Sequence, residues 1–157
     1  MTLTILGLFA GIPLFLWLTS VTVIDTSAML FLLFACGSVG LLKWRYAKQK
    51  VDMTFSQFAM YAYTGFGICF ANLILLINYT ISIGSYTDYY QVRSFNIFNS
   101  YTDLRLYSNT IESGLERCFN HYIDANYEEM PIATRAEADF QRGILGLRVV
   151  KKMRFHE

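Results

Sequence analysis

The sequence predicts an α-helical membrane protein with three transmembrane helices, followed by a small α+β extramembrane domain with a C-terminal β-hairpin. Three runs without Asp, Glu, Lys, Arg or His predict the membrane part, at residues 2–24, 26–42 and 53–87. A helix of about 20 apolar residues is long enough to cross a bilayer. All 13 Lys and Arg residues lie at or after position 43. We therefore expect a transmembrane domain at residues 1–84 and a soluble α+β domain at residues 85–157.

Overall composition argues against two classes of protein. The net charge of +1 lacks the basic excess that is typical of proteins that bind a nucleic-acid polymer. Cys36 and Cys69 lie in apolar runs, and Cys118 is the only cysteine of the polar half. A disulfide framework is therefore not expected.

The first predicted span covers about residues 4–24 and contains Pro13. Proline is tolerated in membrane helices, where it often produces a kink. Gly7 and Gly11 form a GxxxG pair, which permits close approach of a second helix. Ordinary use of glycine in membrane helices is the alternative explanation.

The second predicted span covers about residues 27–42, after a turn at residues 25–27 in which Thr26 or Ser27 can cap the helix. This span is short. Lys43 and Arg45 can extend their charged ends to the membrane surface, and Trp44 is suited to the interface.

The third predicted span covers about residues 58–83 and has small residues at three- and four-residue spacing, which indicates a helix-contact face. Asn72 lies in the middle of the span, where an amide needs a partner on another helix. We expect helix contacts, and association with further copies or with another membrane protein, through Gly7, Gly11, Gly65, Ala71 and Asn72.

Positive charges predict the orientation. Residues 43–50 hold four Lys and Arg residues, and the turn at residues 25–27 holds none. Cytoplasmic loops carry the excess of positive charge, so three crossings would place the C-terminal domain outside. We expect the inner membrane of a bacterium with a periplasmic tail, and a cytoplasmic tail if the number of crossings differs.

The polar half contains patterns of both strands and helices. Residues 89–98 are rich in β-forming residues and residues 104–107 are a candidate partner strand. Asn109 and Glu112 resemble a capping box at the start of a helix that runs to about Tyr122.

Two interpretations fit the last 25 residues. Apolar and polar residues alternate at 136–141 and again at 147–155, and glycines lie between them at 143 and 146, which favours a β-hairpin. The alternative is a helix that begins at Thr134 and has Phe140, Ile144 and Leu147 on one face.

Candidates for catalysis are few, and no cofactor or metal ion is expected. Cys118 and His121 share a helix face at i, i+3, so a thiolate–imidazole pair is geometrically possible. A surface histidine beside a core cysteine explains the same spacing. Glu128 and Glu129 more simply form a solvated acidic loop than a cation site.

The basic C-terminal end is the main candidate for binding. On a strand, Arg148, Lys152 and Arg154 are expected to share one face, which suits a phosphate-bearing ligand, an acidic partner or anionic lipid headgroups. A solvated face that keeps the domain soluble is the alternative. The candidate partner-binding residues are Arg142, Arg148, Lys151, Lys152 and Arg154.

These observations predict a small, non-enzymatic membrane protein that acts by binding. One function that fits is an immunity or accessory subunit that works through helix contacts and an exposed tail. The other is a membrane effector of antiviral defence, whose soluble domain senses a signalling nucleotide through basic residues. The expected partners are a lipid bilayer, further copies or another membrane protein, and an anionic small ligand.

Overall fold

A computed structural model describes residues 7–50, 53–98, 101–106, 113–125 and 135–156. The chain divides into two compact units. The helical unit consists of Met1–Leu18 and Ser27–Leu76, and the β unit consists of Thr19–Thr26 and Ile77–Glu157. The domain boundary predicted between residues 84 and 85 stays a prediction.

Among the described residues, seven helical segments lie in the first part of the chain, and strand β1 (Thr22–Val23) separates the second from the third. They are η1 (Gly7–Gly11), α2 (Ile12–Val21), α3 (Thr26–Leu41), α4 (Trp44–Lys50), α5 (Phe55–Tyr61), η2 (Ala62–Gly67) and α6 (Ile68–Thr80). The two η segments are π-helices, and η2 lies inside one continuous helix from Phe55 to Thr80.

A capping box starts the long helix at Thr54. The N–H of Gln57 donates to Thr54 Oγ1 at 3.4 Å, and the N–H of Thr54 donates to Gln57 Oε1 at 3.1 Å. These two bonds satisfy N–H groups that have no partner inside the helix.

The prediction of three transmembrane helices is wrong. Among the described residues, only Phe55–Thr80, with 26 residues, is long and apolar enough to cross a membrane, by length and composition alone. The helix Gly7–Val21 joins a π-helical segment of five residues to an α-helical segment of ten, and the helix Thr26–Leu41 has 16 residues. Each of these two helices is therefore only about 22–24 Å long. The orientation argument counted three crossings, so it loses its basis.

Secondary structure explains why the expected first and third spans were misplaced. Thr22–Val23 forms strand β1, so the first apolar run leaves the helical conformation before its end. Similarly, Ser82–Phe98 forms strand β2, so the uncharged run that begins at Met53 is shared between a helix and a strand. An uncharged run shows only that a segment is apolar. The length of the helix depends on the residue at which helical hydrogen bonds give way to strand pairing.

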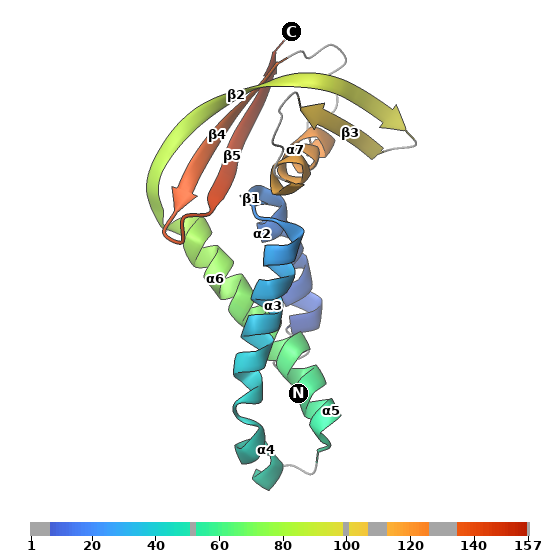
Figure 1. Ribbon diagram of the computed structural model, residues 1–157, viewed down its shortest axis with the longest axis vertical. Helices are drawn as coiled ribbons and strands as arrows, with labels where there is room; N and C mark the ends of the chain where they lie inside the picture. The colour runs from blue at the N-terminus through green and yellow to red at the C-terminus, as the bar shows by residue number, and fades with distance from the viewer. Residues whose placement is uncertain (1–6, 51–52, 99–100, 107–112, 126–134, 157) are drawn as a thin grey trace. The chain divides into compact units, whose positions relative to one another are not determined.

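The β unit contains an antiparallel sheet with strand order β1-β5-β4-β2-β3. Besides β1 and β2, its strands are β3 (Tyr101–Leu106), β4 (Arg135–Gly143) and β5 (Arg148–His156). Figure 1 shows β2 as a long, curved strand that pairs with β4 along its first part and with β3 along its second part. Helix α7 (Ser113–Ala125) covers one face of this sheet.

The β-hairpin predicted for the C-terminal residues is present, and the helical alternative is wrong. Strands β4 and β5 pair from Arg135 opposite His156 to Arg142 opposite Arg148. On β4, burial alternates as the sequence indicated, with Ala136, Ala138 and Phe140 buried. The pairing predicted between residues 89–98 and 104–107 also occurs, as β2 with β3.

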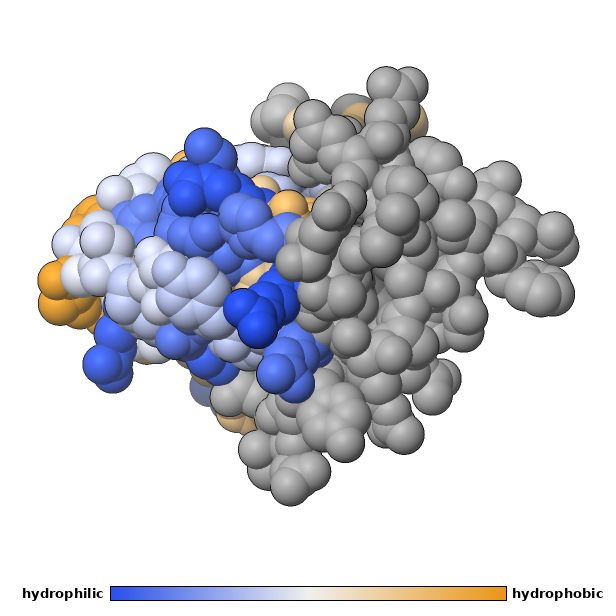
Figure 2. Space-filling model, turned by 90° about the horizontal axis from the view of Figure 1, so that it is seen from above, coloured by the Kyte–Doolittle hydropathy of each residue, from blue (hydrophilic) through white to orange (hydrophobic). Residues whose placement is uncertain are grey.

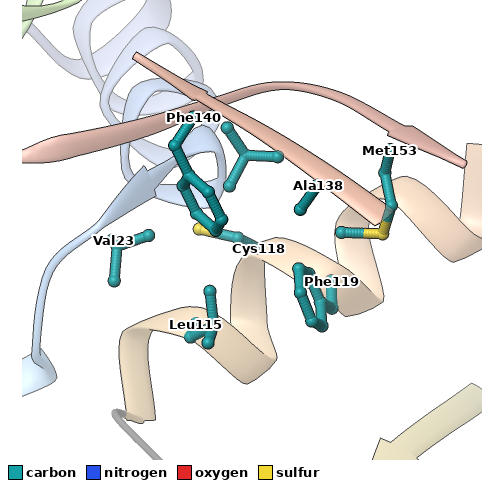
Figure 3. Close-up of a cluster of buried hydrophobic side chains, with 8 residues drawn as sticks. Val23, Leu115, Cys118, Phe119, Ala138, Phe140 and Met153 are labelled. Carbon is teal, nitrogen blue, oxygen red and sulfur yellow. The ribbon is translucent and has the colours of Figure 1, made fainter. Parts of the chain in front are cut away.

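The core of the β unit lies between α7 and the sheet (Figure 3). Leu115, Cys118 and Phe119 of α7 point toward the sheet residues in Figure 3. The buried cluster consists of Val23, Leu115, Cys118, Phe119, Ala138, Phe140, Val150 and Met153. Because Val23 belongs to this cluster, the two-residue strand β1 is part of the core of the β unit.

Helix α7 also contacts the backbone of residues 19–24. Arg117 donates from Nη2 to the carbonyl of Ile24 at 2.7 Å and from Nε to the carbonyl of Thr19 at 3.3 Å. A Cβ at Gly114 would lie 2.6 Å from backbone atoms of Ile24, so only glycine fits this contact. The capping box predicted at Asn109 and Glu112 lies outside the described residues.

Candidate functional site

The turn of the β4–β5 hairpin is attached to the last turn of α6 by Asn78. Asn78 Nδ2 donates to the carbonyl of Leu147 at 3.3 Å, and the N–H of Leu145 donates to Asn78 Oδ1 at 3.1 Å. The N–H of Ile144 donates to the carbonyl of Ile81 at 3.1 Å. Asn78 is completely buried. Its amide therefore replaces water as the partner of two backbone groups of the turn.

Two glycines make this attachment possible. A Cβ at Gly143 would collide with the carbonyl oxygen and the side chain of Asn78. Gly146 has φ of 79°, a conformation that residues with a Cβ rarely adopt. The turn and the helix end can approach closely only because both positions lack a side chain.

Basic residues surround the turn. Arg142 and Arg148 are direct cross-strand partners, and like charges in such a pair repel one another. The Arg148 guanidinium lies 5.7 Å from the centre of the Phe140 ring. Within the described part of the chain, Arg142 is exposed and forms no ion pair. This pair of arginines therefore favours an anion between or beside them.

Lys151 lies at the end of α6. Its Nζ is 3.2 Å from the centre of the Tyr79 ring and donates to the Tyr79 carbonyl at 3.1 Å. The C-terminal end of a helix attracts positive charge, and an aromatic ring face does so too.

The prediction that Arg148, Lys152 and Arg154 share one face is wrong. Asp139 pairs with Lys152 whereas Phe140 pairs with Val150, so Lys151 is an extra residue that forms a β-bulge. Consequently Arg148 lies on the face of Phe140, while Lys152 and Arg154 lie on the opposite face.

On that opposite face, acidic residues of the same sheet pair with Arg154 and His156, and Lys152 is the cross-strand neighbour of Asp139. Arg154 lies 3.3 Å from Glu137 and 3.7 Å from Asp139, and His156 lies 3.1 Å from Glu137. Thr87 donates to Asp139 at 2.7 Å. The candidate binding residues are therefore reduced to those around the turn, namely Arg142, Arg148 and Lys151.

Exposed apolar side chains lie next to these basic residues. Ile144 and Leu145 form the tip of the turn, and Ile81 and Ile83 belong to the segment that pairs with it. Leu145 is 53% exposed and Ile83 is 66% exposed. In the view from above, Figure 2 shows mostly hydrophilic residues on the coloured surface, with hydrophobic ones at its left edge.

The predicted helix-contact residues meet within one chain. Asn72 Nδ2 donates to the carbonyl of Gly11 at 2.8 Å, and Asn72 and Ala71 are buried. A Cβ at Gly7 would collide with the carbonyl of Thr64 and lie 3.0 Å from Gly65 Cα. Because the Gly7 contact and the bond from Asn72 Nδ2 are made within one chain, they do not by themselves argue for association between copies.

Cys118 and His121 do not form the nucleophilic pair that their spacing permits. The Cys118 side chain is completely buried against the sheet. Burial raises its thiol pKa from 9.0 to about 12, an effect that Arg117 and Arg148 partly offset. A protonated thiol is a poor nucleophile. Of the described residues, no group of three or more His, Cys, Asp or Glu could hold a metal ion, and Glu128 and Glu129 lie outside them.

Alkaline pH is expected to destabilise the β unit through Cys118. The unfolded thiol loses its proton above pH 9 while the folded one keeps it up to about pH 12, so the free energy of unfolding falls as pH rises through this window. Urea unfolding at several pH values, monitored by hydrogen exchange of residues 135–156, measures how steeply the free energy of unfolding falls with pH. Cys118→Ala should reduce this slope, and equal slopes for the two proteins would contradict this role of the thiol.

Two important residues were not among the predicted ones, namely Asn78 and Arg117. The partners of Asn78 lie 67 and 69 positions away, and those of Arg117 lie 93 and 98 positions away. A polar residue near the end of an apolar run, as Asn78 is, was the available signal.

Comparisons with known proteins give no relative. No family model, no curated protein and no solved structure matches the chain.

Proposed function

We propose that this protein is anchored in a lipid bilayer by its helical unit and acts by binding through its β unit. The supporting observation is the surface of the helical unit, which exposes large apolar side chains. Phe9 is 80% exposed and Phe31 is 73% exposed, and further examples are Leu16, Leu30, Phe34 and Val39.

The cost of hydrating these six side chains favours a bilayer. Full burial of one large apolar side chain is worth about 1.5–3 kcal/mol. At half of that value, six of them would lose about 5–9 kcal/mol in water. This is comparable to the whole stability of a folded domain, about 5–15 kcal/mol. A surface of this kind is therefore suited to lipid or to a large apolar partner.

The helical unit also has features that are typical of a membrane interface. Trp44 packs against Phe55 at 5.4 Å and against Phe58 at 5.2 Å between ring centres. Lys43 and Arg45 flank it. Tryptophan and basic residues are enriched where a helix leaves the hydrocarbon core.

Within this proposal, an immunity or accessory subunit is the function that fits best, because the described residues offer binding surfaces rather than an activated nucleophile. A second candidate is a membrane effector that senses a nucleotide. The Arg142–Arg148 pair near Tyr86, whose side chain is 39% exposed, favours this candidate, because arginines bind phosphate and an exposed aromatic ring can stack on a base.

Membrane extraction tests the anchoring. The protein in cell membranes should resist an alkaline carbonate wash and dissolve only in detergent. Leu73→Arg places a charge on an exposed apolar position of the long helix, which should cost about 2.5–3.5 kcal/mol of insertion free energy. Leu73→Ala is the matched control and should stay in the membrane. Release of the wild-type protein by carbonate would refute the proposal.

A further inference from the structure

The turn of the β4–β5 hairpin combines an exposed apolar tip, adjacent basic side chains and four successive backbone N–H groups that all donate hydrogen bonds. We propose that this turn, residues 142–148, contacts the surface of an anionic bilayer and holds lipid phosphate groups. The inference rests on the proposed membrane anchoring and adds a specific contact to it.

Backbone pairing makes the turn suitable for a site of low water content. The four successive N–H groups of residues 143–146 each donate a hydrogen bond. Their acceptors are Leu147 O, Ile81 O, Asn78 Oδ1 and Gly143 O, at 2.9–3.1 Å. The carbonyl of Leu147 accepts a second bond from Asn78. Unpaired backbone groups normally keep a turn in water, and these four N–H groups and the Leu147 carbonyl already have protein partners.

Attachment to Asn78 keeps the turn at the C-terminal end of α6. Asn78 lies in the last turn of the only described helix that is long enough to cross a bilayer, and it holds Leu145 and Leu147 directly. When Phe55–Thr80 lies in the bilayer, the residues around Thr80 lie at its boundary. Ile144 and Leu145 are then at the level where apolar side chains enter the region between headgroups and acyl chains.

Charge complementarity selects anionic lipid as the partner. Arg142 is exposed and Arg148 is its cross-strand neighbour, and Lys151 lies beside Tyr79 at the helix end. Each basic residue near an anionic membrane surface contributes about 1 kcal/mol of binding free energy, which strengthens binding about fivefold. A soluble phosphate compound would use the arginines but leave Ile81, Ile83, Ile144 and Leu145 in water. The surface of a bilayer can accommodate the basic side chains among its phosphate groups and the apolar side chains among its acyl chains.

A tryptophan reporter at the tip tests this contact. Leu145→Trp is introduced into the full chain after Trp17→Phe and Trp44→Phe. The protein is reconstituted into vesicles of phosphatidylcholine, alone or mixed with phosphatidylglycerol. Lipids brominated on their acyl chains report immersion, and iodide reports water. The matched control reporter is Tyr89→Trp, an exposed position on β2 about 23 Å along the strand from Ser82.

The expected result is that the reporter at 145 is quenched by the brominated lipid and the one at 89 by iodide. In anionic vesicles, Arg142→Gln should lower the ratio of lipid quenching to iodide quenching at 145 by about fivefold. The matched variant Lys152→Gln lies on the opposite face of the sheet and should leave the ratio unchanged.

Two results would overturn the inference while the anchoring holds. One is a reporter at 145 that iodide quenches in vesicles that retain the protein. The other is a ratio that responds to added inorganic phosphate or ATP instead of to phosphatidylglycerol, which would assign the arginines to a soluble ligand. Protein that does not float with the vesicles would refute the anchoring itself.

Discussion

Phe140→Ala is expected to lower the free energy of unfolding of the β unit by about 3–5 kcal/mol, the range for loss of a buried aromatic side chain. Phe140 is 1% exposed and belongs to the cluster that joins the sheet to α7. Its ring stacks on Tyr86 at 5.4 Å and meets Tyr90 edge-on at 6.2 Å. Alanine would leave a cavity among neighbours that come from four different elements and cannot close around it together.

Hydrogen exchange of residues 135–156 in the full chain, in detergent micelles, measures this effect. The central amides of β4 and β5 should exchange by opening of the whole β unit in the wild-type protein, so their protection falls in proportion to the lost stability. Tyr89→Ala is the matched control, because Tyr89 is an exposed aromatic residue of the same sheet and its loss should change stability by less than about 0.5 kcal/mol. Equal protection in Phe140→Ala and in the control would contradict the position of Phe140 in the core.

The alternation on β4 shows which parts of the fold can be predicted from a sequence. Ala136, Ala138 and Phe140 alternate with polar residues, and the side-chain period of a strand puts them on one face. This local pattern was sufficient to predict the hairpin and its buried face. The same rule failed on β5, because the bulge at Lys151 inserts one residue and reverses the face of Arg148. Nothing in the residues 148–154 marks such an insertion, since it depends on the pairing with β4.

The helical unit shows a different limit of prediction from sequence, which concerns the ends of the helices. Hydropathy located the apolar segments, but it could not show that Thr22 and Val23 pair with Val149 and Arg148. That pairing joins residues more than a hundred positions apart, and it ends the first helix too early for a full crossing. Similarly, Ser82 and Ile83 are apolar or uncharged and suit a strand as well as a helix end. Length and hydropathy do not distinguish a long membrane helix from a shorter helix followed by a strand.

The candidate site was predicted in part. The basic residues were recognised as a group from their number within the last segment, whereas their division between two faces and the ion pairs of Arg154 required the structure. Asn78 was absent from the predicted site because its partners are backbone groups of a turn. Nearly every residue type carries the same backbone groups, so the sequence does not show which of them will bind a side chain. The attachment between helix end and hairpin turn is therefore the feature that most needs an experimental test.

Asn78→Leu is expected to detach the hairpin turn from the end of α6. Leucine has a similar size but can neither accept from the N–H of Leu145 nor donate to the carbonyl of Leu147. Each buried backbone group left without a partner costs about 1–3 kcal/mol, so two of them cost about 2–6 kcal/mol. Protection from hydrogen exchange should fall first in residues 143–147. In the wild-type protein the amides of residues 143–146 donate hydrogen bonds although the tip of the turn is exposed.

Thr80→Ala is the matched control for this prediction. Thr80 lies two residues further along the same helix end, is exposed, and donates from Oγ1 to the carbonyl of Ile77 within its own helix. Its replacement leaves both hydrogen bonds of the Asn78 side chain to the turn in place, so exchange at residues 143–146 should stay as in the wild-type protein.

Gly143→Ala tests the same attachment from the other side. The added methyl group would collide with the Asn78 carbonyl oxygen and side chain, and backbone cannot move away as a flexible side chain does. Both Asn78→Leu and Gly143→Ala should therefore open the turn, although one removes hydrogen bonds and the other adds volume. If only Gly143→Ala opened it, the glycine would be required for the conformation of the turn and Asn78 would be dispensable. Unchanged exchange in Asn78→Leu would thus refute the claim that its amide holds the hairpin.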